Sequence, residues 1–356
     1  MKILRPISIV VCLCLPAAGA TAQTQLLPPP GAPAPAAKAA KPAKAKIIKP
    51  AAKKPAAAAT PAKPQLPSPA TGAATATEDP NADVVFAAYQ RGQYKTAFDL
   101  ATARAGNGDP KAMAMLGELY SGGLGIKRDF AKAADWYKRA ADLGDREAMF
   151  ALAMLRIAGR GGPANREEAA KLLASSAKLG SPKAAYNLAL LYLDGQTLPQ
   201  DLKRAAELLR ISADAGNPEA QYALATFYKE GTGVPKDIEK AVRLLQAASL
   251  ADNVDAEVEY AIALYNGTGT PKNEAAAVAL LRKAARQNSA IAQNRLARVL
   301  VTGAGAPEDK VEGLKWHIVA KTAGKGDLML DEALAQVSAE DRTRAEAAAR
   351  KWLGAK

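Results

Sequence analysis

Side chains that could carry covalent or metal chemistry are few in this sequence. The 356 residues include one histidine, His317, and two cysteines, Cys12 and Cys14, which both lie near the N-terminus. A nucleophile–His–acid arrangement needs a base beside the nucleophile, and a zinc site needs three or four ligands brought together. One histidine without thiols leaves a zinc site short of its usual nitrogen and sulfur ligands, and the sequence shows no recognisable nucleophile–base set. We therefore predict no catalytic residue, no cofactor and no metal, and we interpret His317 as a helix-packing residue.

Two glycine-rich segments are superficially like phosphate-binding loops. Gly122-Gly123-Leu124-Gly125 and Gly159-Arg160-Gly161-Gly162 do not follow a strand, as such loops do, and they recur at a regular interval. We interpret both as turns. The carboxylates of Glu167-Glu168 fall at a predicted helix start, where they favour the helix dipole. The expectation is a protein that is not an enzyme, and the alternative is a hydrolase with an unrecognised site.

The N-terminus has the pattern of a secretory signal peptide. Lys2 and Arg5 precede an apolar stretch over 7–18, and Ala20-Thr21-Ala22 fits the small-x-small cleavage rule. We predict a signal peptide over 1–22, cleavage after Ala22, and a periplasmic or secreted protein without cysteine. An uncleaved anchor is the alternative.

Residues 23–79 consist mostly of Ala, Pro, Lys and Thr, and we predict a disordered linker there. Residues 1–77 contain no Asp or Glu but ten basic residues, eight of them lysines between Lys38 and Lys63. Of the net charge of +13, only about +3 therefore belongs to the rest of the chain. The lysines could form a solvated spacer, or they could attach the protein to an anionic envelope polymer or membrane surface. We expect no nucleic acid partner.

From residue 80 onward the sequence repeats. Six blocks of 36 residues follow one another without insertion, and a period of this length is typical of a solenoid. Each block begins with Asp, Ser or Asn, which are good helix N-caps. The first residues, counted as position zero, are Asp109, Asp145, Ser181, Asn217, Asn253 and Ser289.

Within a block, the positions predict two helices. Positions 3 and 8 are small and position 7 is leucine or tyrosine, which is the spacing of one buried helical face. Position 14 is glycine in every block and predicts a left-handed C-cap. Position 20 is Asp or Asn and predicts a second N-cap, after which alanine at position 24 and Leu or Trp at position 27 are expected to be buried. Glycine, Asp252 or Asn288 is expected to close the pair in a left-handed conformation.

Stacked antiparallel pairs of this kind predict an all-α, right-handed superhelical solenoid over 80–356. Residues 81–108 are expected to form a shortened first pair. From Asp327 a capping pair is expected, with a helix start at Ser338 and with Trp352 and Leu353 sealing the last exposed face.

The first full block, AMAMLGELYSGGLGIKRDFAKAADWYKRAADLGD, resembles the Sel1-like repeat, a relative of the tetratricopeptide repeat. The resemblance covers residues 81–336, with departures at Thr197-Leu198 and Arg156. It implies an adaptor that binds a partner protein. A cysteine-rich branch of the family has been linked to β-lactam binding or hydrolysis, but its cysteine pairs are missing from this sequence.

The resemblance also implies that the first helix of each pair lines a concave groove, at positions 2, 5, 9 and 12. We call the apolar and aromatic residues at these positions the first-helix stripe; they are Phe150, Met154, Ile157, Tyr186, Leu190, Leu193, Tyr222, Ile262 and Tyr265. Aromatic residues and Met are enriched at binding surfaces, which favours a groove for a partner protein of unknown identity. The alternative is ordinary packing between neighbouring first helices. The overall prediction is a non-enzymatic interaction scaffold of the cell envelope.

Overall fold

A computed structural model describes residues 83–354 of the chain, and this part contains sixteen α-helices and no strand. The predicted signal peptide, linker and cleavage site lie outside the described residues. The helices are α1 (Val84–Gln90), α2 (Tyr94–Gly106), α3 (Pro110–Gly122), α4 (Phe130–Asp142), α5 (Arg146–Ala158), α6 (Arg166–Lys178), α7 (Pro182–Asp194), α8 (Leu202–Asp214), α9 (Pro218–Glu230), α10 (Ile238–Leu250), α11 (Val254–Asn266), α12 (Glu274–Arg286), α13 (Ala290–Thr302), α14 (Lys310–Thr322), α15 (Leu328–Gln336) and α16 (Ala339–Leu353).

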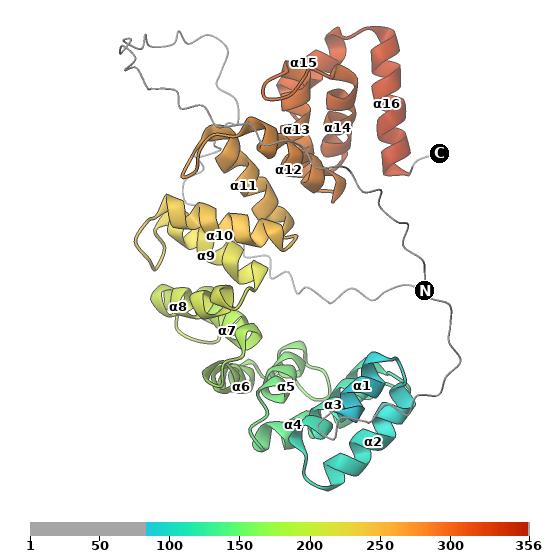
Figure 1. Cartoon of the computed structure of the whole chain (residues 1–356), viewed down its shortest axis with the longest axis vertical. Coiled ribbons are helices and arrows are strands. Elements are labelled where there is room, and N and C mark those ends of the chain that lie inside the picture. Colours follow the sequence, from blue (N-terminus) through green and yellow to red (C-terminus); the bar gives the residue numbers. More distant parts are fainter. Residues whose placement is uncertain (1–82, 355–356) are drawn as a thin grey trace, which may run out of the picture. The chain divides into compact units, whose positions relative to one another are not determined.

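The helices form pairs that stack in chain order, as Figure 1 shows. In each block the first helix packs against the second, and the second packs against the first helix of the next block. The predicted all-α solenoid of antiparallel pairs is confirmed, as is the shortened first pair, formed by α1 and α2. None of the helices among residues 83–354 is long and apolar enough to span a membrane.

Side chains at the start of each helix explain why the helices begin where they do. Asp145 accepts a hydrogen bond from the backbone N of Ala148 at 2.7 Å, and Asn217 accepts one from Ala220 at 2.7 Å. All six predicted first-helix caps make this contact, and so do the predicted second-helix caps. Each cap satisfies a backbone N–H that has no partner within its helix.

The ends of the helices follow the glycine pattern. Gly159 has φ 61° and Gly231 has φ 80°, and the other glycines at position 14 lie in the same left-handed region. Asp252 and Asn288, at the ends of second helices, have φ 60° and 65° and are the non-glycine residues with positive φ in the described part. The predicted left-handed ends are therefore confirmed.

A second glycine, at position 16, holds consecutive blocks close together. A Cβ atom on Gly161 would lie 2.1 Å from the carbonyl oxygen of Phe130, and one on Gly233 would lie 2.3 Å from that of Leu202. Both contacts reach the start of the second helix in the preceding block. In the third block this position is Thr197, whose hydroxyl is buried without a hydrogen-bond partner.

The core of the second helices agrees with the prediction at position 24, which is buried in every block, and only in part at position 27. Leu208 and Trp316 at position 27 are buried as expected, but the other four residues there are half-buried. Position 28, which the sequence did not single out, is buried in every block and is occupied by Tyr137, Leu173, Leu209, Leu245, Leu281 and His317. Position 28 lies four residues after the buried alanine, which is one helical turn, and therefore on the same face.

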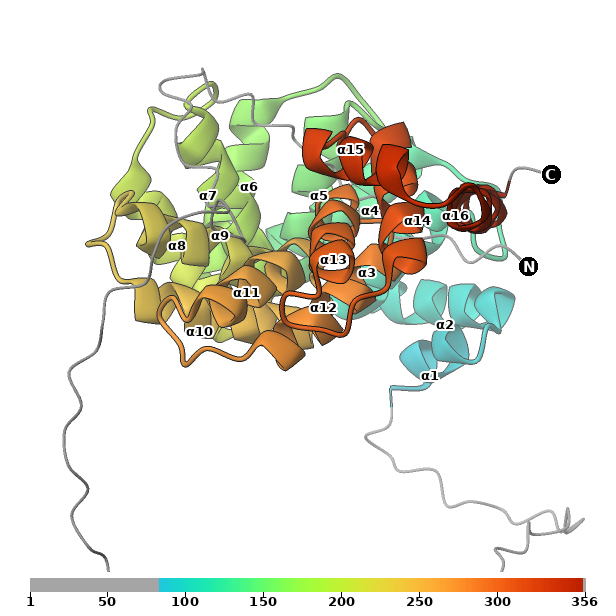
Figure 2. The same cartoon turned by 90° about the horizontal axis from the view of Figure 1, so that it is seen from above.

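At the C-terminal end, α16 packs against α14, and Figure 2 shows the two helices beside each other. The rings of Trp316 and Trp352 meet edge to face with centroids 5.0 Å apart, and the Lys315 ammonium lies 4.0 Å from the Trp316 centroid. Ser338 caps α16 as predicted. The expectation for Leu353 was wrong: its side chain points outward, with 47% of its surface exposed.

Candidate partner-binding surface

The first-helix stripe lies on four first helices, α5, α7, α9 and α11. On each helix its members are spaced by three or four residues and therefore share a face. Eight of the nine are half-buried, and Phe150, Met154 and Tyr186 pack partly against the core of the neighbouring pairs. These eight residues therefore contribute to packing and also leave part of each side chain accessible.

Tyr186 and Tyr222 are the aromatic members that keep a free polar end. Neither hydroxyl has a hydrogen-bond partner among residues 83–354, and neither is enclosed. Burial, together with the charge of Glu219, raises the pKa of Tyr186. Burial raises the pKa of Tyr222 to about 12, with added effect from Asp255, Glu259 and Glu230. Both phenols therefore stay protonated at neutral pH and can donate a hydrogen bond to a ligand.

Tyr265 differs from the other stripe residues because it is bound within the chain. Only 6% of its surface is exposed, and its hydroxyl donates to the carbonyl oxygen of Ala304 at 3.2 Å. A Cβ atom on Gly305 would lie 3.1 Å from the Tyr265 ring. Tyr265 thus supports the loop of the following block.

Charged residues flank the stripe, and the sequence indicates Lys229 and Glu118 among them but not the carboxylates of the middle first helices. Lys229 pairs with Glu259 at 3.0 Å, which links α9 to α11. Glu219, Glu230 and Asp255 are exposed. A count of charges on each first helix would have drawn attention to these residues, since they recur next to the positions of the stripe.

The last first helix, α13, has polar residues at positions 5 and 9, and both contact another part of the chain. Asn294 donates to the Asp327 carboxylate at 3.0 Å, and Arg298 forms an ion pair with it. Asp327 also caps α15, as the sequence predicted for a helix beginning there. This end of the first-helix row is therefore used to hold the C-terminal helices.

His317 is fully buried on α14, in agreement with the packing interpretation. Its Nε2 lies 2.8 Å from Asp331 Oδ1 of α15, and Lys321 reaches the same oxygen at 2.7 Å. Its Nδ1 atom has no hydrogen-bond partner among residues 83–354. The His317–Asp331 contact links α14 to α15.

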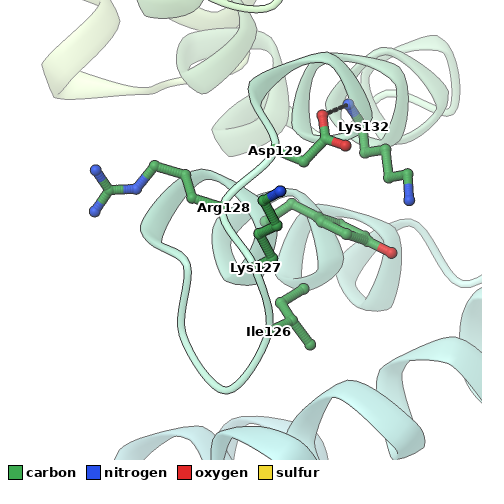
Figure 3. A pocket seen from close by; sticks show the side chains of 6 residues that line it. Ile126, Lys127, Arg128, Asp129 and Lys132 are labelled. Carbon is green, nitrogen blue, oxygen red and sulfur yellow. Dashed lines mark hydrogen bonds between the residues drawn. The ribbon is translucent and has the colours of Figure 1, made fainter.

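A shallow pocket of about 280 Å³ opens beside the loop between α3 and α4 (Figure 3). Tyr120, Ile126, Lys127, Arg128, Asp129 and Lys132 line it. The Asp129 carboxylate is occupied as the cap of α4, and Lys132 lies 5.5 Å above the Tyr120 ring. Figure 3 shows Arg128 extending away from Lys132, so the cations do not converge.

In the part of the chain that the structure describes, no group of three or more His, Cys, Asp or Glu side chains could hold a metal ion.

Comparison with solved structures supports the same fold. A Sel1 repeat protein from Oxalobacter formigenes is 26% identical with a TM-score of 0.60, and the match covers 67% of this chain and 98% of that one. The antigen c5321 of uropathogenic Escherichia coli, described as protective and as displaying an SLR fold, is 26% identical with a TM-score of 0.53. That match covers 72% of this chain but only 64% of c5321, so this chain spans less than two thirds of that protein. No curated protein matched the chain.

The family model for the Sel1 repeat matches six consecutive segments, residues 110–145, 146–181, 182–217, 218–253, 254–289 and 290–325. These are the six predicted blocks, shifted by one residue. With repeat sequence, helix pairs and caps in agreement over more than half of its length, the chain belongs to the Sel1 repeat family.

Proposed function

We propose that this chain is a non-enzymatic scaffold of the cell envelope that binds a partner protein on the first-helix stripe around Tyr186, Leu190 and Tyr222. Sel1 repeat proteins are in general protein-interaction scaffolds and are generally not enzymes. The observation that carries the proposal is the pair of half-buried tyrosines on consecutive first helices, whose hydroxyls have no partner in the described part of the chain.

Tyrosine suits this task because a rigid ring buries a large apolar area while its hydroxyl provides a directional contact. The middle of the stripe is also supported on both sides, since α7 and α9 each pack between second helices. A binding surface held by rigid elements loses little conformational entropy when a ligand arrives.

Location in the envelope rests on the predicted signal peptide. If residues 1–22 direct export, the mature protein begins at Gln23. N-terminal sequencing of protein isolated from cells tests this, and an intact Met1 would contradict it.

A second candidate function is attachment to an anionic envelope polymer or membrane surface through the lysines between Lys38 and Lys63. Ten basic residues without one acidic residue over 1–77 favour it. Its test is envelope association of the full chain at increasing salt, since screening weakens attraction between exposed charges. Association that does not respond to salt would contradict this candidate.

The partner can be identified by a photo-crosslinking amino acid at Leu190, between the two tyrosines, with the same amino acid at exposed Arg210 on α8 as control. For a protein crosslinked only from position 190, we expect Tyr186→Ala with Tyr222→Ala to weaken binding tenfold or more, since aromatic anchors contribute on the order of 1–3 kcal/mol each.

The matched control is Tyr192→Ala with Tyr228→Ala. These two tyrosines lie on the same helices at position 11, outside the stripe. Circular dichroism on both double variants verifies that the helices remain. Equal affinity of the Tyr186/Tyr222 variant and the parent would show that the stripe is inter-repeat core, and the proposed function would be wrong.

A further inference from the structure

The charge of the first helices changes along the array. α7, α9 and α11 together carry two lysines and six carboxylates, whereas α5 carries two arginines and one glutamate, and α13 two arginines and no carboxylate. One of the six carboxylates, Glu257, is fully buried and pairs with Lys283 at 2.6 Å. Five carboxylates and two lysines remain, so the middle first helices form an acidic stretch between basic neighbours.

Three of these five carboxylates are exposed and unpaired. Glu259 pairs with Lys229 at 3.0 Å, and Asp194 lies 3.8 Å from Arg166. Within residues 83–354, Glu219, Glu230 and Asp255 have neither an ion pair nor a side-chain hydrogen bond. Glu219 and Asp255 lie in the first turns of α9 and α11, where they favour the helix dipole, but no cation among residues 83–354 forms an ion pair with any of the three.

Helical spacing relates two of the unpaired carboxylates to the first-helix stripe. Glu219 precedes Tyr222 by three residues on α9, and Asp255 precedes by four residues on α11 the Glu259 that pairs with Lys229 of α9. Residues at these separations share a helical face. The charge of Glu219 also adds to the burial that raises the pKa of Tyr186, and the charge of Asp255 adds to the burial that raises the pKa of Tyr222.

We propose that the acidic stretch formed by Glu219, Glu230 and Asp255 selects the partner, and that the bound segment is an extended peptide in which Lys or Arg side chains alternate with apolar ones. The inference rests on the proposed function and specifies its ligand. Cationic heads would meet the carboxylates, while apolar side chains lie on Tyr186 and Tyr222.

The same contacts already occur within the chain, which shows that its tyrosines accept cations. Lys132 lies 5.5 Å from the Tyr120 centroid, and Lys240 lies 5.4 Å from that of Tyr228. A cation over an aromatic face is stabilised by the ring quadrupole. Unpaired surface charge of one sign also accelerates association with a ligand of opposite sign and repels ligands of the same sign.

The test uses the full chain with the eight lysines from Lys38 to Lys63 changed to Gln, so that its own lysines do not compete. The probe is a fluorescein-labelled peptide with three copies of Ala-Lys-Leu-Pro, and the control probe has Glu in place of Lys. We expect the lysine peptide to bind at least about tenfold more tightly than the glutamate peptide, and less tightly as salt increases.

Glu219→Lys with Asp255→Lys should weaken binding of the lysine peptide about tenfold or more. The matched control is Glu207→Lys with Glu239→Lys on α8 and α10, which changes the net charge equally on exposed second-helix positions. It should leave binding within about twofold. Equal binding of both peptides, or equal losses in the two variants, overturns the inference.

The outcomes separate this inference from the proposed function. If the crosslinked partner needs the tyrosines but binds Glu219→Lys/Asp255→Lys as it binds the parent, the stripe is a binding surface and the charge selection is wrong. If the partner binds the Tyr186→Ala/Tyr222→Ala variant unchanged, the proposed function is wrong, and this inference falls with it.

Discussion

The first helices α9 and α13 occupy equivalent places in the array but differ in what they contact. At positions 5 and 9, α9 has Tyr222 and Thr226, and the Tyr222 hydroxyl is without a partner in the described chain. The same positions of α13 are Asn294 and Arg298, and both hold the Asp327 carboxylate. The same surface of the repeat therefore leaves a tyrosine hydroxyl without a partner in the middle of the described array and holds the chain's own C-terminal helices at its end.

The register of the following helix accounts for the difference. A seventh block would begin at residue 325, but the next helix, α15, is capped at Asp327 and is only nine residues long. Its companion α16 packs directly on α14. The displaced cap brings Asp327 over α13. In the middle blocks the next first helix begins at the residue that the 36-residue repeat predicts, and the stripe is left open.

The largest effect is expected at the C-terminal end. Asp327→Ala removes the cap of α15 and leaves Arg298 and Asn294 without their acceptor, at a cost of about 3 kcal/mol to the free energy of unfolding of the terminal helices. Hydrogen exchange of α14 to α16 and urea unfolding measure this loss. The control, Asp255→Ala, removes an unpaired carboxylate and should change stability by less than about 0.5 kcal/mol. Equal losses in both would show that Asp327 does not hold this end.

The second-largest effect is expected when α9 receives the residues of α13. Tyr222→Asn with Thr226→Arg gives α9 the side chains of the terminal block without supplying an Asp327. We expect partner affinity to fall about tenfold or more, because an aromatic anchor is lost and the acidic stretch gains a positive charge. Titration calorimetry with the purified partner checks this. Unchanged affinity would mean that the difference between α9 and α13 has no bearing on recognition.

Lowering the pH should destabilise the C-terminal helices before it destabilises the middle blocks. Burial would by itself raise the pKa of Asp327, but hydrogen bonds from Arg298 and Asn294 outweigh it and lower the pKa below its usual value. The Lys321 and His317 contacts likewise lower the pKa of Asp331. A carboxyl whose folded pKa is depressed stabilises the fold above its unfolded pKa of about 4 and loses that contribution as the pH falls further.

Hydrogen exchange at pH values from about 6 to about 3 should therefore show α15 losing protection before α9. Asp327→Asn keeps the cap but cannot ionise, so in this variant the difference between the two helices should respond less to pH. Simultaneous loss of protection in α9 and α15 of the parent would contradict the prediction that Asp327 and Asp331 make the C-terminal helices more sensitive to acid.

The smallest effect is expected from His317. His317→Gln retains a group able to bond Asp331 and should cost about 1 kcal/mol in stability, with partner affinity unchanged. His317→Phe should likewise leave partner binding intact. Complete loss of biological activity in a folded His317→Gln protein would instead support an enzymatic role for this residue.

Local chemistry explains which parts of the fold the sequence predicts well. Caps such as Asp145 and glycines such as Gly159 act on their own backbone, so helix boundaries follow from residue type and spacing. In the second helix of the first block the buried residue is Tyr137 and not the predicted Trp136, because both side chains are large and only the packed structure shows which one faces the core.

The sequence predicts which residues form the candidate surface, but it does not predict which other side chains contact them. The stripe positions follow from the repeat, and eight of the nine residues are half-buried, a state compatible with both interpretations offered by the sequence. The Asp327 contact with α13 depends on a two-residue shift at the start of α15, and no repeat pattern contains that information. Likewise, the free state of Glu219 and Asp255 depends on side chains of neighbouring pairs.

The contact between consecutive blocks, here called the joint, has a consequence for how the protein can evolve. Every block starts at a side-chain cap and ends at a left-handed residue, and each joint is the same contact of a second helix with the next first helix. A gene segment of 36 codons could be duplicated or deleted in frame, and each new joint would repeat an existing one. The row of helix pairs could thus lengthen or shorten in steps of one pair ahead of the last block, whose Asn294 and Arg298 are needed to hold the helices after Asp327.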